Sequence, residues 1–320
     1  MSLFLHAGND LTHLAESLRN VIAELKRGPL KRIQVVVPTP ETGRWLELWL
    51  AERDGICANI DLILPQKFIH SLMDSLLGHF ENGEKFTKNA MSWWLWARLR
   101  DLPDNPIFLP LRGYLDNDPD GRATFALARQ LATLFDRYIV YRPELMSGKM
   151  SPSTHPWQWE LWQACVRESG GKNPSDRHFE LIKRLQDEVV KLDSELPVLF
   201  FGHDTLAPSY METLRALARH KEVRIFAWQP TSEIWDDLLP VRDQLSAAHK
   251  SGVVGADLHF DRGQSLLVGC GKIGRDYFKL LRGEENDIAG DADHFWEPES
   301  GTALASLQRA VLSAVPTGNR

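Results

Sequence analysis

The stretch VVVPTPETGRWLELWL, residues 35 to 50, decides the fold class of this chain. Three β-branched residues run into a Pro-Thr-Pro turn, and the residues after the turn have helical spacing. At about 100° per residue, Trp45, Leu46 and Trp49 fall on one side of a helix. A buried strand that leads into a helix through a tight turn is the basic unit of an α/β sheet. We therefore expect an α/β fold with a parallel sheet.

The turn at residues 38–44 has two interpretations. In open α/β sheets ligands bind beside the carboxyl ends of the strands, so this segment would line such an edge. Alternatively, Pro38 and Pro40 only end the strand and shape the start of the next helix.

Composition limits the class of protein. With 320 residues, 43% hydrophobic and 25% charged, the chain is typical of a globular protein with one large domain or two ordinary ones. The net charge of −6 disfavours a general nucleic-acid coat but allows a local basic face. The cysteines are far apart, which indicates a reducing compartment and neither a zinc site nor a disulfide framework. They are Cys57, Cys165 and Cys270.

Two features bear on location. No apolar run approaches the roughly 18 residues of a membrane span. The opening MSLFLHAGND lacks the basic start of a signal peptide. We therefore expect a cytoplasmic protein without a membrane partner.

Strand and helix patterns recur on both sides of a helical region, which predicts a helicase-like α/β domain (1–85 and 193–320) and an inserted helical subdomain (86–192). Expected strands are Leu3–Ala7, Ala58–Leu64, Pro197–Gly202 and Val223–Trp228. Expected helices are Asp10-capped to about Lys26, Gln66–Leu77, Met91–Leu102, Arg122–Val140, Trp157–Glu168, His178–Leu192, Tyr210–Arg219, Leu266–Leu281 and Thr302–Ala314, with an acidic loop over Asn286–Gly301.

The chain lacks the motifs of an ATPase. Its first turn offers one glycine, Gly8, and Gly-Lys-Ser/Thr occurs nowhere. The strand PVLFFG ends in Gly202 and His203, where a magnesium-holding aspartate would be needed, and Asp204 comes too late. Pro119-Asp120 has no Glu-x-Lys partner for a metal-dependent nuclease. We identify no catalytic or metal-binding residues and expect no cofactor in this chain.

Residues 269–274, GCGKIG, match the dinucleotide pattern G-x-G-x-x-G. That loop requires a second strand after its helix, and the sequence RGEENDIAGDADHFW offers no credible one. The pattern therefore does not predict cofactor binding.

The helix expected from Arg122 carries arginines opposite its apolar side, and its end interleaves arginine with aromatic residues. Arg129, Arg137 and Arg142 suit phosphates, and Tyr138 and Tyr141 suit stacking on bases or packing. The alternative is a solvated basic face on which Asp136 pairs locally. Trp93, Trp94 and Trp96 form one of several tryptophan clusters, which favour either a core or a stacking platform.

An ordered set of short segments resembles the amino-terminal, helicase-like region of the RecC family, the gamma chains of exodeoxyribonuclease V. The segments extend from about residue 6 to about residue 280. They include Val36–Thr39, Gly43–Leu46, Ala58–Asp61, Leu64–Pro65, Phe68–Ile69, Met91–Trp93, Phe135–Tyr138, Val140–Pro143 and Gly271–Tyr277.

The resemblance implies a fold like superfamily 1 helicase domain 1A with an inserted, 1B-like helical subdomain and decayed ATPase motifs. It also places GCGKIG in a helical segment. RecC-like chains join RecB-like and RecD-like motor and nuclease subunits, which use ATP and magnesium. They split duplex ends and guide the 3′-ended single strand through a tunnel, in double-strand-break repair and recombination. Such chains are several times longer than this one.

The resemblance also implies which residues line the tunnel. Pro38, Pro40 and Arg44 stand where polar, base-reading side chains are expected, and His70 replaces a tryptophan, so this chain departs from the hotspot-reading pattern. The implied positions are Pro38, Pro40, Arg44, Leu64, His70, Leu134, Asp136, Arg137, Arg142 and Arg177.

The sequence leaves three functions open. The chain is a non-catalytic DNA-binding scaffold part of a helicase–nuclease, an active nuclease or helicase subunit with unrecognised motifs, or a protein–protein scaffold without DNA contact.

Overall fold

The computed structural model describes residues 2–25, 31–116, 118–148, 155–187, 190–192, 194–235, 238, 264–283, 288–299 and 301–315. The chain divides into two compact units. A sheet unit comprises residues 1–68, 194–206 and 214–320, and a helical unit comprises residues 69–193 and 207–213.

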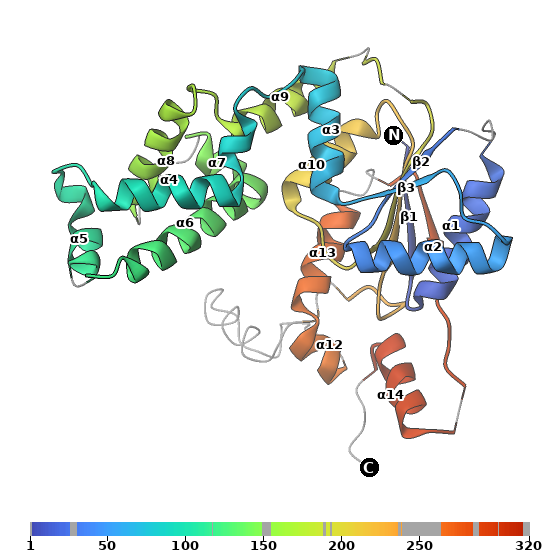
Figure 1. Ribbon diagram of the computed structural model, residues 1–320. Helices are drawn as coiled ribbons and strands as arrows, with labels where there is room; N and C mark the ends of the chain where they lie inside the picture. The colour runs from blue at the N-terminus through green and yellow to red at the C-terminus, as the bar shows by residue number, and fades with distance from the viewer. Residues whose placement is uncertain are drawn as a thin grey trace, which may run out of the picture. The chain divides into compact units, whose positions relative to one another are not determined.

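The sheet unit contains, within the described ranges, a six-stranded sheet of order β3-β2-β4-β5-β1-β6 (Figure 1). Each pair of neighbouring strands is parallel. The expected α/β fold with a parallel sheet is therefore confirmed. The strands are β1 (Leu3–Gly8), β2 (Ile33–Val36), β3 (Ile60–Ile63), β4 (Val198–His203), β5 (Val223–Trp228) and β6 (Gly290–Asp293).

Alternating side chains of the strands enter two packing layers, as the period of a strand requires. On one face, Phe201 of β4 belongs to a buried cluster with residues of helices α1 (Leu11–Glu24) and α2 (Pro40–Asp54). Trp45 stacks on Phe201 with ring centroids 6.2 Å apart. On the other face, Phe200 meets Phe68 edge-on at 5.6 Å. Phe68 lies in the first turn of α3 (Pro65–Leu77).

The Pro-Thr-Pro turn is the start of α2. Thr39 is the N-cap, and its hydroxyl accepts a hydrogen bond from the backbone N–H of Thr42 at 3.2 Å. Pro40 is the first helical residue, where a missing N–H costs nothing. Asp10 caps α1 in the same manner, as predicted, by accepting the N–H of Thr12 at 2.7 Å.

The helical unit has its own core, which lies between α4, α6 and α8. Its centre is Trp162, which is fully buried and contacts Phe86 and Phe135, each at 5.7 Å between ring centroids. The Trp162 indole N–H donates to the carbonyl of Met146 at 2.9 Å. The elements are η1 (Gly83–Phe86), α4 (Lys88–Arg100), η2 (Pro106–Phe108), α5 (Leu109–Leu115), α6 (Arg122–Tyr141), α7 (Pro143–Met146), α8 (Pro156–Glu168) and α9 (Pro174–Gln186).

Two predicted helices were wrong in extent. The helix predicted from His178 instead begins at Pro174, because the side chain of Asn173 caps it. The helix predicted over residues 266–281 is two helices, α12 (Ser265–Cys270) and α13 (Lys272–Arg282). Arg275 reaches back to donate to the carbonyl of Leu267 at 2.6 Å, which satisfies the end of α12. GCGKIG is therefore helical, as the resemblance implied.

The acidic loop predicted over residues 286–301 was also wrong, because it contains β6. The segment has no apolar alternation, so its strand has no signal in the sequence. It is held instead by backbone hydrogen bonds to β1, from Ala289 N–H to Leu3 and from His294 N–H to Ala7, each 2.7 Å long. The remaining helices of the sheet unit, α10 (Pro208–Leu217, whose first residues belong to the helical unit) and α14 (Ala303–Leu312), complete the described elements.

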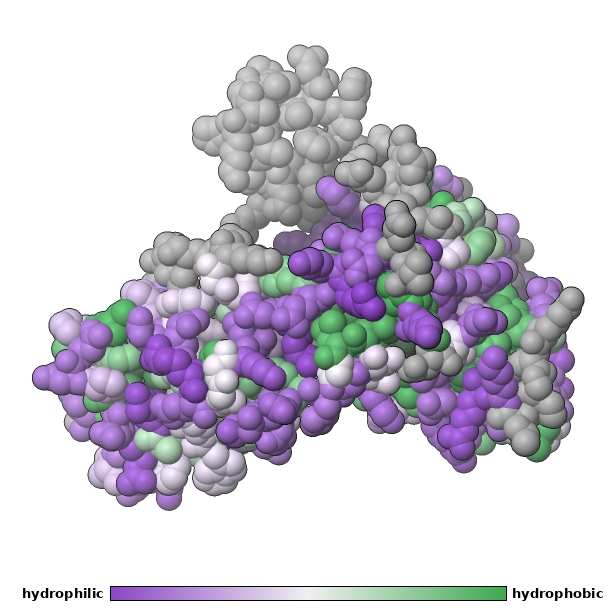
Figure 2. Space-filling view, turned by 90° about the horizontal axis from the view of Figure 1, so that it is seen from above, coloured by the Kyte–Doolittle hydropathy of each residue, from purple (hydrophilic) through white to green (hydrophobic). Residues whose placement is uncertain are grey.

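The surface is mainly polar. Hydrophilic residues predominate on the face seen in Figure 2, where apolar side chains form smaller patches. None of the helices within the described ranges is long and apolar enough to cross a membrane.

Candidate nucleic-acid interface

Helix α6 presents a basic face opposite its buried side. Ala128, Leu131 and Phe135 are buried, and Arg129 and Arg137 are exposed. This split follows the helical period of the sequence. Arg122 is also exposed and lies on the same side, since residues seven and fifteen positions apart return to nearly the same direction at about 100° per residue. The face therefore carries three guanidinium groups, as predicted.

The start of α6 is fixed by Asp118. Its carboxylate accepts hydrogen bonds from the backbone N–H groups of Ala123 at 3.1 Å and Thr124 at 2.7 Å. These bonds hold the pKa of Asp118 below its usual value, because they stabilise the charged form. Gly121 precedes the helix with φ +69°, a conformation that favours glycine. The basic face therefore stands on a well-anchored helix.

The arginines of this face differ in their ion pairing. Within the described ranges, no carboxylate pairs with Arg129 or Arg137. Arg142, at the end of the helix, pairs with Glu144 at 2.5 Å. Asp136 pairs with Lys88 of α4 at 3.1 Å, so it does not neutralise its neighbour Arg137. Two charges consequently stay available for an anionic ligand.

The other predicted residues of α6 lie at the border of the core. Leu134 and Tyr138 are half-buried and pack against the helical core. Tyr141 is 49% exposed. Of the two tyrosines predicted to stack on bases or to pack, Tyr141 thus offers the more accessible ring, and Tyr138 contributes to packing.

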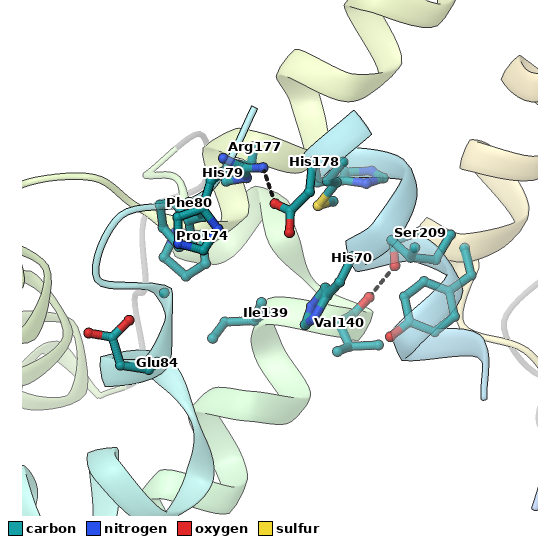
Figure 3. Close-up of a pocket in the computed structure, with 15 residues that line it drawn as sticks. His70, His79, Phe80, Glu84, Ile139, Val140, Pro174, Arg177, His178 and Ser209 are labelled. Atoms are coloured by element: carbon teal, nitrogen blue, oxygen red, sulfur yellow. Dashed lines mark hydrogen bonds and ion pairs between the residues drawn. The ribbon is translucent and has the colours of Figure 1, made fainter. Parts of the chain in front are cut away.

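A cavity of about 290 Å³ lies within the helical unit, beside the carboxyl end of α6 (Figure 3). His70 and Arg177, two of the predicted residues, line it together with Ile139 and Val140. Figure 3 shows the imidazole of His70 projecting from α3 toward Ile139 and Val140 of α6. The lining is mixed, with apolar walls and a few polar groups, as is usual for ligand pockets.

Arg177 is the fixed cation of the cavity. Its side chain is 12% exposed and pairs with Asp74 at 3.1 Å. The same guanidinium donates to the carbonyl of Gly78 at 2.9 Å and lies 4.9 Å from the ring centroid of Phe80. These contacts orient Arg177, and the Asp74 carboxylate offsets its charge.

The cavity histidines have different surroundings. Burial lowers the pKa of His70, Arg177 lowers it further, and the carboxylates of Asp74 and Asp136 oppose these effects. His70 is therefore mainly uncharged at neutral pH. His178 lies 2.9 Å from the carboxylate of Glu212.

Two predicted residues, Arg44 and Leu64, belong to the sheet unit and are exposed. Arg44 pairs with Glu47 at 2.7 Å on α2. Leu64 follows β3 at the carboxyl edge of the sheet, next to the turn that holds Pro38. The helical unit brings the remaining predicted residues together on α6 and around the cavity.

The carboxyl ends of β1 and β4 carry no recognisable phosphate or metal chemistry. The ring of His203 is fully buried, and neither of its nitrogens has a hydrogen-bond partner. Burial lowers its pKa to about 3. Among the described residues, no cluster of three or more histidine, cysteine or acidic side chains could hold a metal ion.

Sequence reasoning did not single out Lys88 or Trp93 as members of this interface. Trp93 is 60% exposed and contacts Phe125 of α6, with ring centroids 5.4 Å apart. A helical projection of residues 88–100 places Trp93 away from the buried Met91 and Leu95, and this signal could have found it.

Comparison with known proteins adds an independent result. Residues 3–314 match the family described as RecC, N-terminal domain. The RecBCD enzyme subunit RecC of Escherichia coli is 28% identical over 335 residues, which cover 93% of this chain and 29% of that protein. The same subunit of Haemophilus influenzae is 26% identical over 366 residues, covering 95% and 32%. That of Mycolicibacterium smegmatis is 28% identical over 295 residues, covering 90% and 26%. The chain thus spans about a third or less of these relatives.

Proposed function

Because the chain belongs to the family of RecC N-terminal domains, we propose that it is a non-catalytic, DNA-guiding scaffold part of a RecBCD-type exodeoxyribonuclease V. In this proposal it guides the 3′-ended single strand from a duplex end during double-strand-break repair and recombination. RecB-like and RecD-like subunits are its partners and supply the ATP- and magnesium-dependent motor and nuclease activities. The related subunits carry RecBCD in their names, which supports this assembly.

One observation carries the DNA-binding part of the proposal, which is the basic face of α6. Arg129 and Arg137 are exposed, have no carboxylate partner among the described side chains, and project from one side of an anchored helix. A row of unpaired guanidinium groups suits the phosphates of a strand. In a chain with a net charge of −6 such a concentration of positive charge is local.

The cavity gives this path a second element. His70 and Arg177 line it, and Arg142 follows the end of α6 nearby in sequence. An apolar cavity with an oriented cation next to a phosphate-binding face suits a base of the same strand. We propose that Leu134, Asp136 and Tyr138 form the border between the basic face and this cavity.

Sequence readout is a separate matter within the proposal. Pro38 and Pro40 offer no side-chain hydrogen bond, and Arg44 is paired with Glu47. We therefore propose that the first turn contacts the strand through Arg44 and Leu64 without reading bases as a polar turn would. A hotspot, if the complete protein scans for one, differs from that of relatives with polar residues there.

We place this activity in the cytoplasm. Cys57, Cys165 and Cys270 are free thiols, which suits a reducing compartment. Partner subunits and chromosomal DNA are available in the same compartment.

The test is binding of a labelled single strand to the chain and to two double variants with the same change of charge. Arg129→Ala/Arg137→Ala removes the basic face, and Lys183→Ala/Arg184→Ala removes two exposed cations from α9. We expect the first variant to bind at least about tenfold more weakly, since each phosphate contact contributes to affinity, and the second to bind like the original chain. Equal affinity of all three proteins would contradict the proposal.

A further inference from the structure

The indole of Trp93 stands out on the surface of the helical unit. Its side chain is 60% exposed, although the neighbouring residues Met91 and Leu95 are fully buried. Trp94 donates its N–H to Glu168, and the guanidinium of Arg100 lies 4.8 Å from the ring centroid of Trp96. Of the three tryptophans in this cluster, Trp93 presents the largest exposed ring.

The exposed ring is held in a fixed orientation. Its centroid lies 5.4 Å from that of Phe125 on α6, with 46° between the planes. Trp96 meets it edge-on at 5.9 Å and 89°. Edge and tilted contacts of this kind restrict the rotamers of an aromatic side chain. Trp93 is therefore an accessible ring whose position is already set, so binding a ligand costs little side-chain entropy.

The location of the ring relates it to the basic face. Lys88 contacts Asp136 and Trp93 contacts Phe125, so α4 runs antiparallel to α6 along the same side of that helix. Arg129 is one turn beyond Phe125 and lies on the same side. We call the surface formed by Lys88, Trp93, Phe125 and Arg129 the seam surface.

The charges of the seam surface favour one kind of ligand. Lys88 neutralises Asp136, the acid that lies within it, and Arg129 remains unpaired among the described residues. Arg100 adds a further exposed cation beside Trp96. A ring flanked by cations matches single-stranded nucleic acid, in which bases and phosphates alternate. An acidic protein partner would use the cations but would leave the rigid exposed indole without a comparable flat contact.

We propose that Trp93 stacks on a base of single-stranded DNA while Arg129 contacts an adjacent phosphate, so that the seam surface extends the strand path proposed above. This inference rests on the proposed function and adds a base-contacting residue that the RecC resemblance did not indicate. Every base has a π face, so Trp93 contributes affinity without sequence preference.

The experiment separates base stacking from phosphate contacts. Two labelled strands of equal length are bound to the full chain, one of thymidines and one abasic throughout, which keeps the phosphates and lacks the bases. We expect the chain to prefer the thymidine strand. Trp93→Ala should weaken binding of the thymidine strand by about tenfold and leave the abasic strand nearly unchanged. Trp93→Phe, which keeps a ring, should retain part of the preference.

Matched controls make the result specific. Trp296→Ala removes another exposed tryptophan, which lies in the sheet unit and is 42% exposed, and it should keep the preference intact. Arg129→Ala should weaken both strands to a similar extent. Equal thermal unfolding of Trp93→Ala and Trp93→Phe excludes a folding defect.

Several outcomes would overturn the inference, and they are distinguishable. If Arg129→Ala/Arg137→Ala weakens binding but Trp93→Ala does not, the strand path stands and the stacking role falls. If Trp93→Ala weakens both strands equally, Trp93 supports the fold or a phosphate contact and not a base. If Trp93→Ala impairs only assembly with partner subunits, the seam surface is a protein interface. If the unmodified chain binds neither strand, the proposed function falls with it.

Discussion

The ammonium group of Lys88 lies 3.1 Å from the carboxylate of Asp136, so the first residue of α4 neutralises an acid next to Arg137 on α6. Both side chains are partly exposed, at 58% and 20%. A pair of this kind contributes little stability in water. Its main consequence is electrostatic, because the face that carries Arg129 and Arg137 is not opposed by a free acid.

Replacing Asp136 tests whether this acid repels the strand or reads it. Asp136→Asn removes one negative charge and frees Lys88, so we expect affinity for single-stranded DNA to rise about two- to fivefold at low salt. Fluorescence anisotropy with mixed-sequence and homopolymer strands measures the change. Unchanged affinity for homopolymers combined with lost preference among mixed sequences would assign Asp136 to base readout instead.

Lowering the pH should strengthen DNA binding through His70. Burial, reinforced by Arg177, lowers the pKa of this histidine, so it carries little charge at neutral pH in the free chain. A nearby phosphate favours the charged form, so binding takes up a proton and affinity rises as the pH falls through 6.5 and below. We expect an increase of about two- to fivefold between pH 7.5 and pH 5.5.

The matched comparison for this pH effect is His70→Gln against His220→Gln, which changes a histidine of the sheet unit. The first should flatten the profile and the second should preserve it. A profile that is the same in both variants would remove His70 from the strand path.

Stability of the sheet unit should fall with acid because of His203. Its folded-state pKa is lowered to about 3 by burial, and its ordinary value is 6.5. The unfolded chain therefore binds more protons between these values, and the free energy of unfolding decreases as the pH falls from 6.5 toward 3. His6, lowered to about 4 by burial, Arg224 and His294, acts in the same direction.

Denaturant unfolding at pH 7, 6 and 5 measures this slope. His203→Phe keeps a ring in the same place and should reduce the slope by up to about 1.4 kcal/mol per pH unit. An unchanged slope in this variant would show that His203 is solvated or hydrogen-bonded in solution.

Trp162 should be the most sensitive position of the helical core. It is fully buried, contacts Phe86 and Phe135, and donates to the carbonyl of Met146. We expect Trp162→Ala to lower the free energy of unfolding of the helical unit by about 3–5 kcal/mol. Trp93→Ala, at an exposed position, should cost less than about 1 kcal/mol. Urea unfolding followed by circular dichroism compares them, and similar costs would contradict this description of the core.

The sequence predicted the sheet unit better than its last strand, for a physical reason. Residues 35–50 and Val223–Trp228 bury apolar side chains at a clear period, so their strands and helices are visible without coordinates. Gly290–Asp293 joins the sheet only through backbone hydrogen bonds to β1, and these leave no trace in the side-chain pattern. Long-range pairing of this kind appears only when the strands are placed.

The candidate interface shows the same difference. The period of α6 placed Arg129 and Arg137 on the exposed side, and the structure agrees. The sequence did not reveal that Arg177 is bound by Asp74 and Gly78, because these partners come from α3 and the turn after it. It also left the tryptophans at 93–96 unresolved, because burial of each ring depends on α6 and α8.

The most direct test of the central claim is the salt dependence of single-strand binding by the chain and by Arg129→Ala/Arg137→Ala. For single strands the slope of the logarithm of the binding constant against the logarithm of the salt concentration changes by about 0.7 for each phosphate contact. We predict that the double variant has a slope shallower by about 1.4, while Lys183→Ala/Arg184→Ala keeps the original slope. Identical slopes for the three proteins would contradict the claim that the α6 face binds the strand.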